Sequence, residues 1–198
     1  YIKRYESAAQ PETEIVIEPA SFIRSEGSVS IAEDGSVNTG NDSYLEWEIT
    51  VEQAGLYNLK IDYYPTVSKG GGIERTLYID GGVPFKEASY MTFSRVYTDG
   101  EIQKNAKGDE LTPEQIESPR WLEYILCDSE RFESGYLKVY LTEGVHSVIL
   151  EANKEELCLG DITFCNIEEP VSYEEYLSEN GEPSELENTE TYRSGGRA

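Results

Sequence analysis

The chain has 198 residues, with 39 acidic and 16 basic side chains, so its formal net charge is −23. A surface this negative repels phosphate backbones and anionic lipid headgroups, which argues against nucleic-acid binding and peripheral membrane attachment. Hydrophobic residues make up 38% of the chain and 15 residues are tyrosine, enough for a buried core. No apolar run approaches the roughly 18 residues that a membrane-spanning helix needs, so we expect no direct membrane insertion.

Cysteine and histidine are too few for most metal and nucleophile chemistry. Cys127, Cys158 and Cys165 contain no CxxC pair, and His146 is the single histidine. This argues against a structural zinc site and removes mechanisms that need two histidines. We expect small buried thiols, and the sequence leaves open whether any two of them pair.

The strongest local pattern is an alternation of apolar and polar residues. Every second side chain is apolar in residues 44–51, and the pattern resumes at residues 57–64 after a short turn that contains Gly55. Such alternation is typical of a strand with one buried side, and Trp47 falls on that side. Two such runs joined by a short turn predict an antiparallel hairpin.

Short strands are predicted along most of the rest of the chain. Their ranges are 14–18, 28–31, 75–80, 91–98, 121–126, 136–141, 146–152 and 157–165, with a hairpin turn at residues 142–144. About ten short strands with turn signals between them predict an all-β fold, namely an antiparallel β-sandwich or jelly roll. No alternation of strands with helices is visible, which argues against a parallel α/β sheet.

One or two short helices are also predicted. Residues 112–115 carry a threonine N-cap, a first-turn proline and a glutamine at the third helical position, and residues 172–175 show a similar start signal with Gly181 as a stop. The tail after residue 180 is acidic and has few apolar side chains. We therefore expect a β-sandwich module over residues 12–167, followed over residues 168–198 by a short helix and an acidic linker to a further domain.

Three motifs occur in an order that matches one class of modules. Residues 46–64 join a tryptophan strand through an Ala-Gly turn to a strand with alternating tyrosines. Residues 141–150, with Gly144 and His146, and residues 160–164 supply the later two motifs. Together they resemble galactose-binding-like carbohydrate-binding modules over most of residues 14–166. The resemblance implies a galactose-binding-domain-like jelly roll.

The middle of the chain narrows the resemblance further. Residues 83–121 look like the modules attached to extracellular solute-binding lipoproteins of Gram-positive bacteria, and related modules are attached to glycoside hydrolases. This implies an extracellular or cell-surface address in a bacterium, with any export signal upstream of residue 1. It also implies that further domains of the same chain are partners.

Sugar binding by such a module needs exposed aromatic faces beside a few polar groups. Trp121 begins a predicted strand after a long loop, and Tyr64 ends a strand on its polar side beside a glycine-rich loop, so both are candidate platforms. Tyr97 and Asp99 end another strand and are further candidates. The alternative for Trp121 is packing or anchoring of its loop.

The resemblance also implies an amide contact and a metal site. Asn153 lies in the loop before the last strand, from which related modules often contact the sugar, although a simple turn asparagine explains it as well. A structural calcium ion, which takes oxygen ligands, would lie between Glu18 and Asp161. Related modules usually have Glu-x-Glu at the first position, whereas Val16 and Ala20 flank Glu18 here. Solvated carboxylates are therefore the alternative.

The first functional hypothesis is a non-catalytic module that binds carbohydrate at the rim of the jelly roll. The alternative is a structural or protein-docking β-sandwich with no sugar ligand, because a fold does not determine a function. An enzyme ranks third. Acidic pairs such as Glu155-Glu156 lie in turns or in the tail, and a glycosidase needs two carboxylates that face one sugar.

Overall fold

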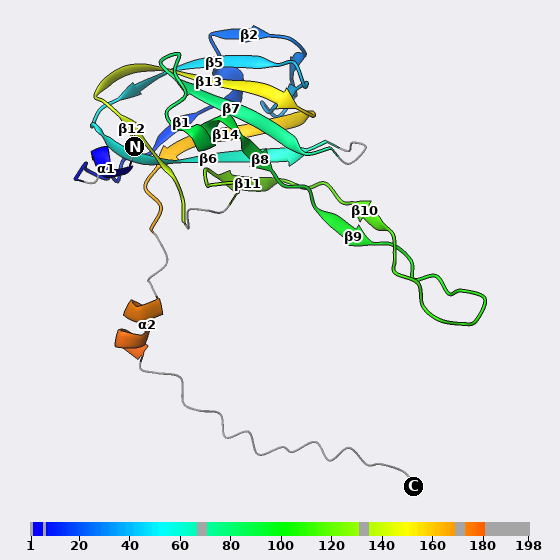
Figure 1. Ribbon diagram of the computed structural model, residues 1–198. Coiled ribbons are helices and arrows are strands. Elements are labelled where there is room, and N and C mark those ends of the chain that lie inside the picture. Colours follow the sequence, from blue (N-terminus) through cyan, green and yellow to red (C-terminus); the bar gives the residue numbers. More distant parts are fainter. Residues whose placement is uncertain (1, 6, 67–70, 131–134, 169–172, 181–198) are drawn as a thin grey trace. The chain divides into compact units, whose positions relative to one another are not determined.

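The computed structural model describes residues 2–5, 7–66, 71–130, 135–168 and 173–180. The chain divides into two compact units, Tyr1–Ile167 and Glu168–Ala198. The first unit holds two packed β-sheets (Figure 1). The described part of the second unit is helix α2 (Tyr173–Asn180), as expected from its start signal, whereas Ser172 and Gly181 lie outside the described residues. No helix within the described ranges has the length and apolar character to cross a membrane.

All strand pairings are antiparallel, which confirms the predicted all-β sandwich. One sheet has the order β2 (Arg24–Glu26), β5 (Tyr44–Val51), β13 (Gly144–Lys154), β7 (Ile73–Ile79) and β8 (Met91–Phe93). The other sheet has the order β11 (Leu122–Ile125), β6 (Gly55–Pro65), β14 (Leu157–Cys165), β4 (Val37–Thr39) and β3 (Val29–Ile31). Its two remaining strands are β1 (Ile15–Ile17), which pairs with β14, and β12 (Lys138–Leu141), which pairs with β6.

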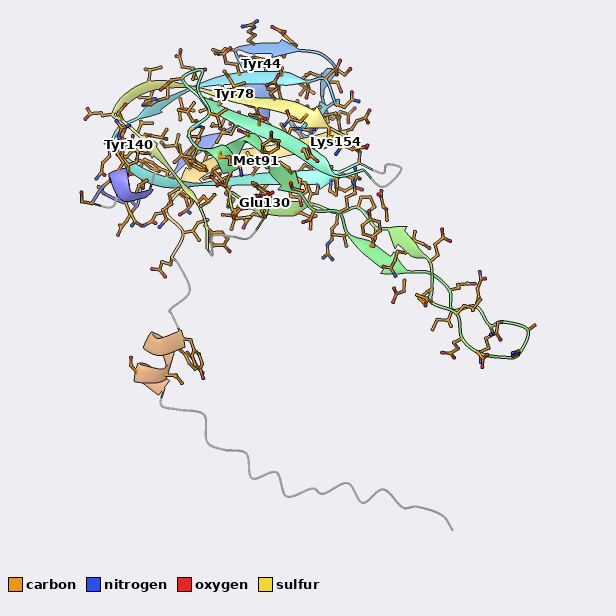
Figure 2. All side chains as sticks on the ribbon, in the orientation of Figure 1. Tyr44, Tyr78, Met91, Glu130, Tyr140 and Lys154 are labelled. Carbon is orange, nitrogen blue, oxygen red and sulfur yellow. The ribbon has the colours of Figure 1, made fainter. Side chains whose placement is uncertain are left out.

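The core lies between the sheets, where the apolar side chains of alternating strands meet. Trp47 on β5 is completely buried, as predicted, and its indole Nε1 donates a hydrogen bond to the backbone oxygen of Pro19 at 3.1 Å. Tyr44 also lies on β5 but has the opposite parity, so it belongs with Tyr78 to the outer face of the five-stranded sheet (Figure 2). The period of two therefore sorts the side chains of β5 as expected.

Both predicted hairpins are wrong. β5 pairs with β2 and β13 in one sheet, and β6 pairs with β11, β12 and β14 in the other, so the turn before Gly55 crosses from sheet to sheet. The turn at residues 142–144 likewise connects β12 in the seven-stranded sheet to β13 in the five-stranded sheet. A short turn can connect two neighbouring strands of one sheet or two strands in opposite sheets. Here the apolar sides of β5 and β6 bury more surface by facing each other across the core.

The predicted helix at residues 112–115 is also wrong. Gln115 begins strand β10 (Gln115–Glu117), which pairs with β9 (Tyr97–Asp99) in a separate two-stranded ribbon. The predicted strand at 91–98 is therefore two strands, β8 and β9. The ribbon extends away from the sheets (Figure 1). A single helical turn forms few backbone hydrogen bonds and is only marginally stable. Pairing with β9 gives Gln115–Glu117 backbone hydrogen-bond partners that such a turn would lack.

The remaining elements are short. α1 (Ile2–Tyr5) places Tyr5 against Tyr140 with ring centroids 4.2 Å apart, and the 3-10 turns are η1 (Pro19–Ser21) and η2 (Lys86–Ser89). Strands β2 and β4 lie in regions where no strand is predicted. Cys158 and Cys165 are buried thiols, as expected, whereas Cys127 is only partly buried, which differs from the expectation.

One arginine is buried between the sheets. Arg75 on β7 is 1% exposed, and its guanidinium donates to the backbone oxygens of Glu74 and Lys154, both at 2.9 Å. It also donates to Thr39 Oγ1 on β4 at 3.1 Å, and Thr39 in turn donates to the backbone oxygen of Leu157 at 2.7 Å. Arg75 therefore links the two sheets through hydrogen bonds.

Candidate functional site

The candidate site forms where β14 loses a neighbouring strand. β14 pairs with β4 through residues 157–159 and with β1 through residues 162–164, so Gly160 and Asp161 lie in the gap between these two neighbours. At the same two residues the pairing of β14 with β6 shifts register. A glycine inside a strand often marks such a bulge.

An open pocket of about 470 Å³ fills this gap. Its walls are η1 with the preceding residue, the turn before β4, and the residue that precedes β11. We call it the Trp121 groove; its lining residues are Glu18, Pro19, Ala20, Asp34, Gly35, Ser36, Asp62, Trp121, Gly160 and Asp161. Four segments distant in sequence therefore contribute carboxylates to one concave surface.

The indole of Trp121 forms the aromatic wall of the groove. The residue is 49% exposed, and its ring packs edge-to-face against Tyr64 with centroids 5.9 Å apart. The ring also lies directly on Gly160, since a Cβ atom there would be 3.1 Å from Cζ3 of Trp121 and 3.0 Å from Cβ of Asp62. A Cβ at these distances would require the indole or Asp62 to shift by a few tenths of an ångström, so Gly160 and Tyr64 together set the position of Trp121.

The carboxylates of the groove differ in their surroundings. Asp34 Oδ1 accepts hydrogen bonds from the hydroxyl and the backbone nitrogen of Ser36, at 2.6 and 3.0 Å, and these bonds lower the pKa of Asp34. Asp62 lies between two buried residues of β6 and so points away from the core. Partial burial raises the pKa of Asp62, with Asp161 among the contributing negative charges.

The predicted calcium ligands Glu18 and Asp161 both line the groove. In the part of the chain that the structure describes, however, no three Asp, Glu, His or Cys side chains form a group that could hold a metal ion. Calcium usually takes about six to eight oxygen ligands, so these side chains as placed do not fit a calcium site. Calcium binding stays a prediction, and the function proposed for the groove does not depend on it.

Two predicted contacts lie on the ribbon instead of in the groove. The hydroxyl of Tyr97 lies 3.4 Å from Glu117 Oε1, and Gln115 Nε2 donates to Asp99 Oδ1. Neither Tyr97 nor Asp99 lines the Trp121 groove. A sugar contact by either residue stays a prediction.

Asn153 lies near the end of β13 in the five-stranded sheet. Its Nδ2 donates to Thr76 Oγ1 at 2.8 Å and to the backbone oxygen of Ser89 at 3.3 Å. These bonds tie β13 to β7 and η2, and Asn153 is outside the lining of the groove. The structure thus gives this amide a local structural partner, while its sugar contact stays a prediction.

Sequence reasoning missed seven of the ten lining residues, among them Asp34, Asp62 and Gly160. Asp62 is on the same side of its strand as Tyr64, so its parity could have identified it. A glycine within the predicted strand 157–165 was a signal of the bulge. Asp34 precedes a glycine in an ordinary turn sequence, and nothing local to it indicates a site.

Comparison with known proteins gives structural likenesses only. No family model matches the chain, and no curated protein matches it in sequence. Among solved structures, the Podospora anserina GH26-CBM35 β-(1,4)-mannanase is 12% identical, with a TM-score of 0.47 over 81% of this chain and 29% of that chain.

Two separate modules are similar over nearly their whole length. The C-terminal CBM6 of LamC, a marine laminarinase from Zobellia galactanivorans, is 13% identical, with a TM-score of 0.46 over 78% of this chain and 100% of that chain. A family 35 carbohydrate-binding module from Clostridium thermocellum is 14% identical, with a TM-score of 0.43 over 81% of this chain and 97% of that chain. The function of the present chain therefore has to be argued from its own groove.

Proposed function

We propose that this chain is a non-catalytic carbohydrate-binding module that holds a sugar in the Trp121 groove. The observation that carries this proposal is a half-exposed indole and several carboxylates around one open pocket. The C–H face of a pyranose ring stacks on an aromatic face, while its hydroxyl groups donate hydrogen bonds to fixed acceptors. Both kinds of contact are present in the same concavity.

Four residues that line the groove, together with Tyr64, have distinct roles in this proposal. Trp121 is the stacking platform, and Tyr64 together with Gly160 sets its orientation. Asp62 and Asp161 accept hydrogen bonds from sugar hydroxyls. The groove is open and shallow, so we expect a dissociation constant on the order of micromolar to millimolar for one module. Attachment to further domains, at an extracellular or cell-surface location in a bacterium, would raise effective affinity by linking several modules.

The test is calorimetric or NMR titration of the chain with a panel of defined oligosaccharides. Trp121→Ala should weaken binding of any ligand found by about two- to tenfold, because a stacked aromatic ring contributes about 0.5–1.5 kcal/mol to such contacts. Tyr90→Ala is the matched control, since Tyr90 is 60% exposed and does not line the groove. Equal affinities of the wild type and Trp121→Ala for the same sugar would refute the assignment.

The ribbon favours a second candidate function, that of a protein-docking module. Ile102, Leu111 and Ile116 expose about half or more of their side chains along the segment that extends from the sandwich. Clustered exposed apolar side chains indicate an interaction surface. A docking role predicts that residues 101–114 are cut by protease in this chain but protected in a longer protein that contains the neighbouring domain. Equal cleavage in both would rule out docking through the ribbon.

A further inference from the structure

All the charged residues that line the Trp121 groove are negative. Four of its ten lining residues are carboxylates, namely Glu18, Asp34, Asp62 and Asp161, and none of the ten is lysine, arginine or histidine. A neutral sugar would bring no positive charge to these carboxylates. A sugar acid would add another negative charge.

Neighbouring cations do not neutralise the four carboxylates. Lys60 on β6, whose charge acts on Asp62, itself pairs with Glu123 at 3.4 Å. Among the residues that the structure describes, none of the four lining carboxylates takes part in an ion pair. Burial raises the pKa of Asp62; the charge of Lys60 lowers it and the charges of Glu123 and Asp161 raise it, and the net direction is upward.

The indole wall supplies an independent reason to expect a cationic ligand. Trp121 exposes about half of its surface beside these carboxylates. An ammonium group is attracted to the face of a tryptophan ring, in addition to the stacking of the sugar ring itself. The net charge of −23 further attracts cations to the surface at low ionic strength.

We propose that the Trp121 groove binds amino sugars that carry a protonated amine, in preference to neutral sugars and to sugar acids. This inference rests on the proposed function and names the substrate class of the same site. The pyranose ring stacks on Trp121, and its ammonium group pairs with Asp62 and Asp161. The interaction is electrostatic, so its strength falls as salt is added.

The experiment compares three oligosaccharides of equal length by calorimetry, in the presence of a chelator. They are a glucosamine trimer, the N-acetylglucosamine trimer, which has the same rings without the charge, and a galacturonic acid trimer. At about pH 5.5 the amine is protonated and carboxylates of ordinary pKa are ionised. We expect the glucosamine trimer to bind about tenfold more tightly than the N-acetylated trimer at low salt, and the uronate trimer not to bind. Added salt should weaken only the glucosamine complex.

Substitutions of the groove carboxylates test whether their charge causes the preference for the glucosamine trimer. Asp62→Asn and Asp161→Asn together should bring the two glucosamine-based trimers to nearly equal affinity while retaining the amide as a hydrogen-bonding group. Glu52→Gln is the control for loss of surface charge outside the groove, since Glu52 is exposed and does not line the groove. It should leave the preference unchanged.

The outcomes distinguish the two proposals. If the N-acetylated trimer binds as tightly as the glucosamine trimer and Trp121→Ala abolishes both, the amino-sugar inference is wrong and the proposed function stands. If the uronate trimer binds most tightly, the inference is again overturned. If none of the three binds, and a wider panel of neutral sugars also fails, the proposed function fails together with the inference.

Discussion

Replacement of Arg75 by methionine should destabilise the sandwich, even though it removes a buried charge. The side chain of Arg75 crosses from β7 to Thr39 on the opposite sheet and satisfies the backbone oxygens of Glu74 and Lys154. Methionine fills a similar volume but donates no hydrogen bond. The substitution therefore removes the donor from three acceptors, one in a buried bond to Thr39 and two in partly buried bonds to backbone oxygens.

The size of the effect follows from two opposing contributions. Each hydrogen bond from a charged donor contributes about 1.5–3 kcal/mol, and Arg75 makes three of them. Burial lowers the pKa of Arg75 to about 10. At neutral pH this depression corresponds to a penalty on the order of 3 kcal/mol for the buried charge. Three such bonds together contribute about 4.5–9 kcal/mol, so we expect Arg75→Met to lower the free energy of unfolding by about 1.5–6 kcal/mol once the penalty is subtracted.

The effect should not depend on pH in the ordinary range. A base whose folded pKa is depressed carries the full burial penalty at every pH below that folded value, and the penalty is relieved only above it. Arginine is protonated in both the folded and the unfolded chain below about pH 10. Measurements at pH 6 and pH 8 should therefore give the same difference between the variant and the wild type.

The assay is urea unfolding followed by tryptophan fluorescence and by circular dichroism. Lys154→Met is the control, because Lys154 pairs with Glu74 at 3.0 Å at the surface (Figure 2 labels Lys154). An exposed pair of this kind contributes less than about 1 kcal/mol. If Arg75→Met is as stable as the wild type, or more stable, the three hydrogen bonds contribute no more than the cost of burying the arginine charge, and the reasoning is wrong.

Three further substitutions test the core and the groove. Trp47→Phe removes the hydrogen bond to Pro19 that ties the core to the groove wall, and it should lower the free energy of unfolding by about 1–2 kcal/mol in the same urea assay. Asp62→Asn should raise stability at pH 7, because the raised pKa of Asp62 shows that its charged form is disfavoured on folding. Its advantage should shrink as the pH falls through that raised pKa, and an advantage that grew instead would contradict the sign. Gly160→Ala should weaken sugar binding several-fold, since the new Cβ would displace the ring of Trp121; unchanged affinity would show that the ring position does not matter.

The local pattern predicted the strands well because alternation is a property of neighbouring residues. Trp47 and the apolar positions beside it face the core as expected. The same pattern could not tell that β5 and β6 belong to different sheets. A period of two identifies the buried side of a strand, but it does not identify the strand on the other side of the core.

The site was predicted in part for the same reason. Trp121 and Tyr64 lie at strand ends on solvent-facing positions, which their parity indicates, and they do contact each other. Tyr97 met the same local criteria but lies on the ribbon, because its strand pairs with β10 and not with a sheet. The helix start signal at residues 112–115 was similar to the one at residues 172–175, where helix α2 does form from Tyr173 onward. Only the long-range pairing decided against a helix at residues 112–115.

The sequence by itself therefore determined that this protein is an acidic, all-β chain with a tryptophan-centred core, since charge and alternation are local quantities. The tertiary structure alone decided where the groove lies. Glu18, Asp34 and Asp161 are more than a hundred positions apart at the extremes, and they meet because β14 changes partner from β4 to β1 at a bulge. Register between distant strands depends on how the whole core packs, so no local pattern contains it.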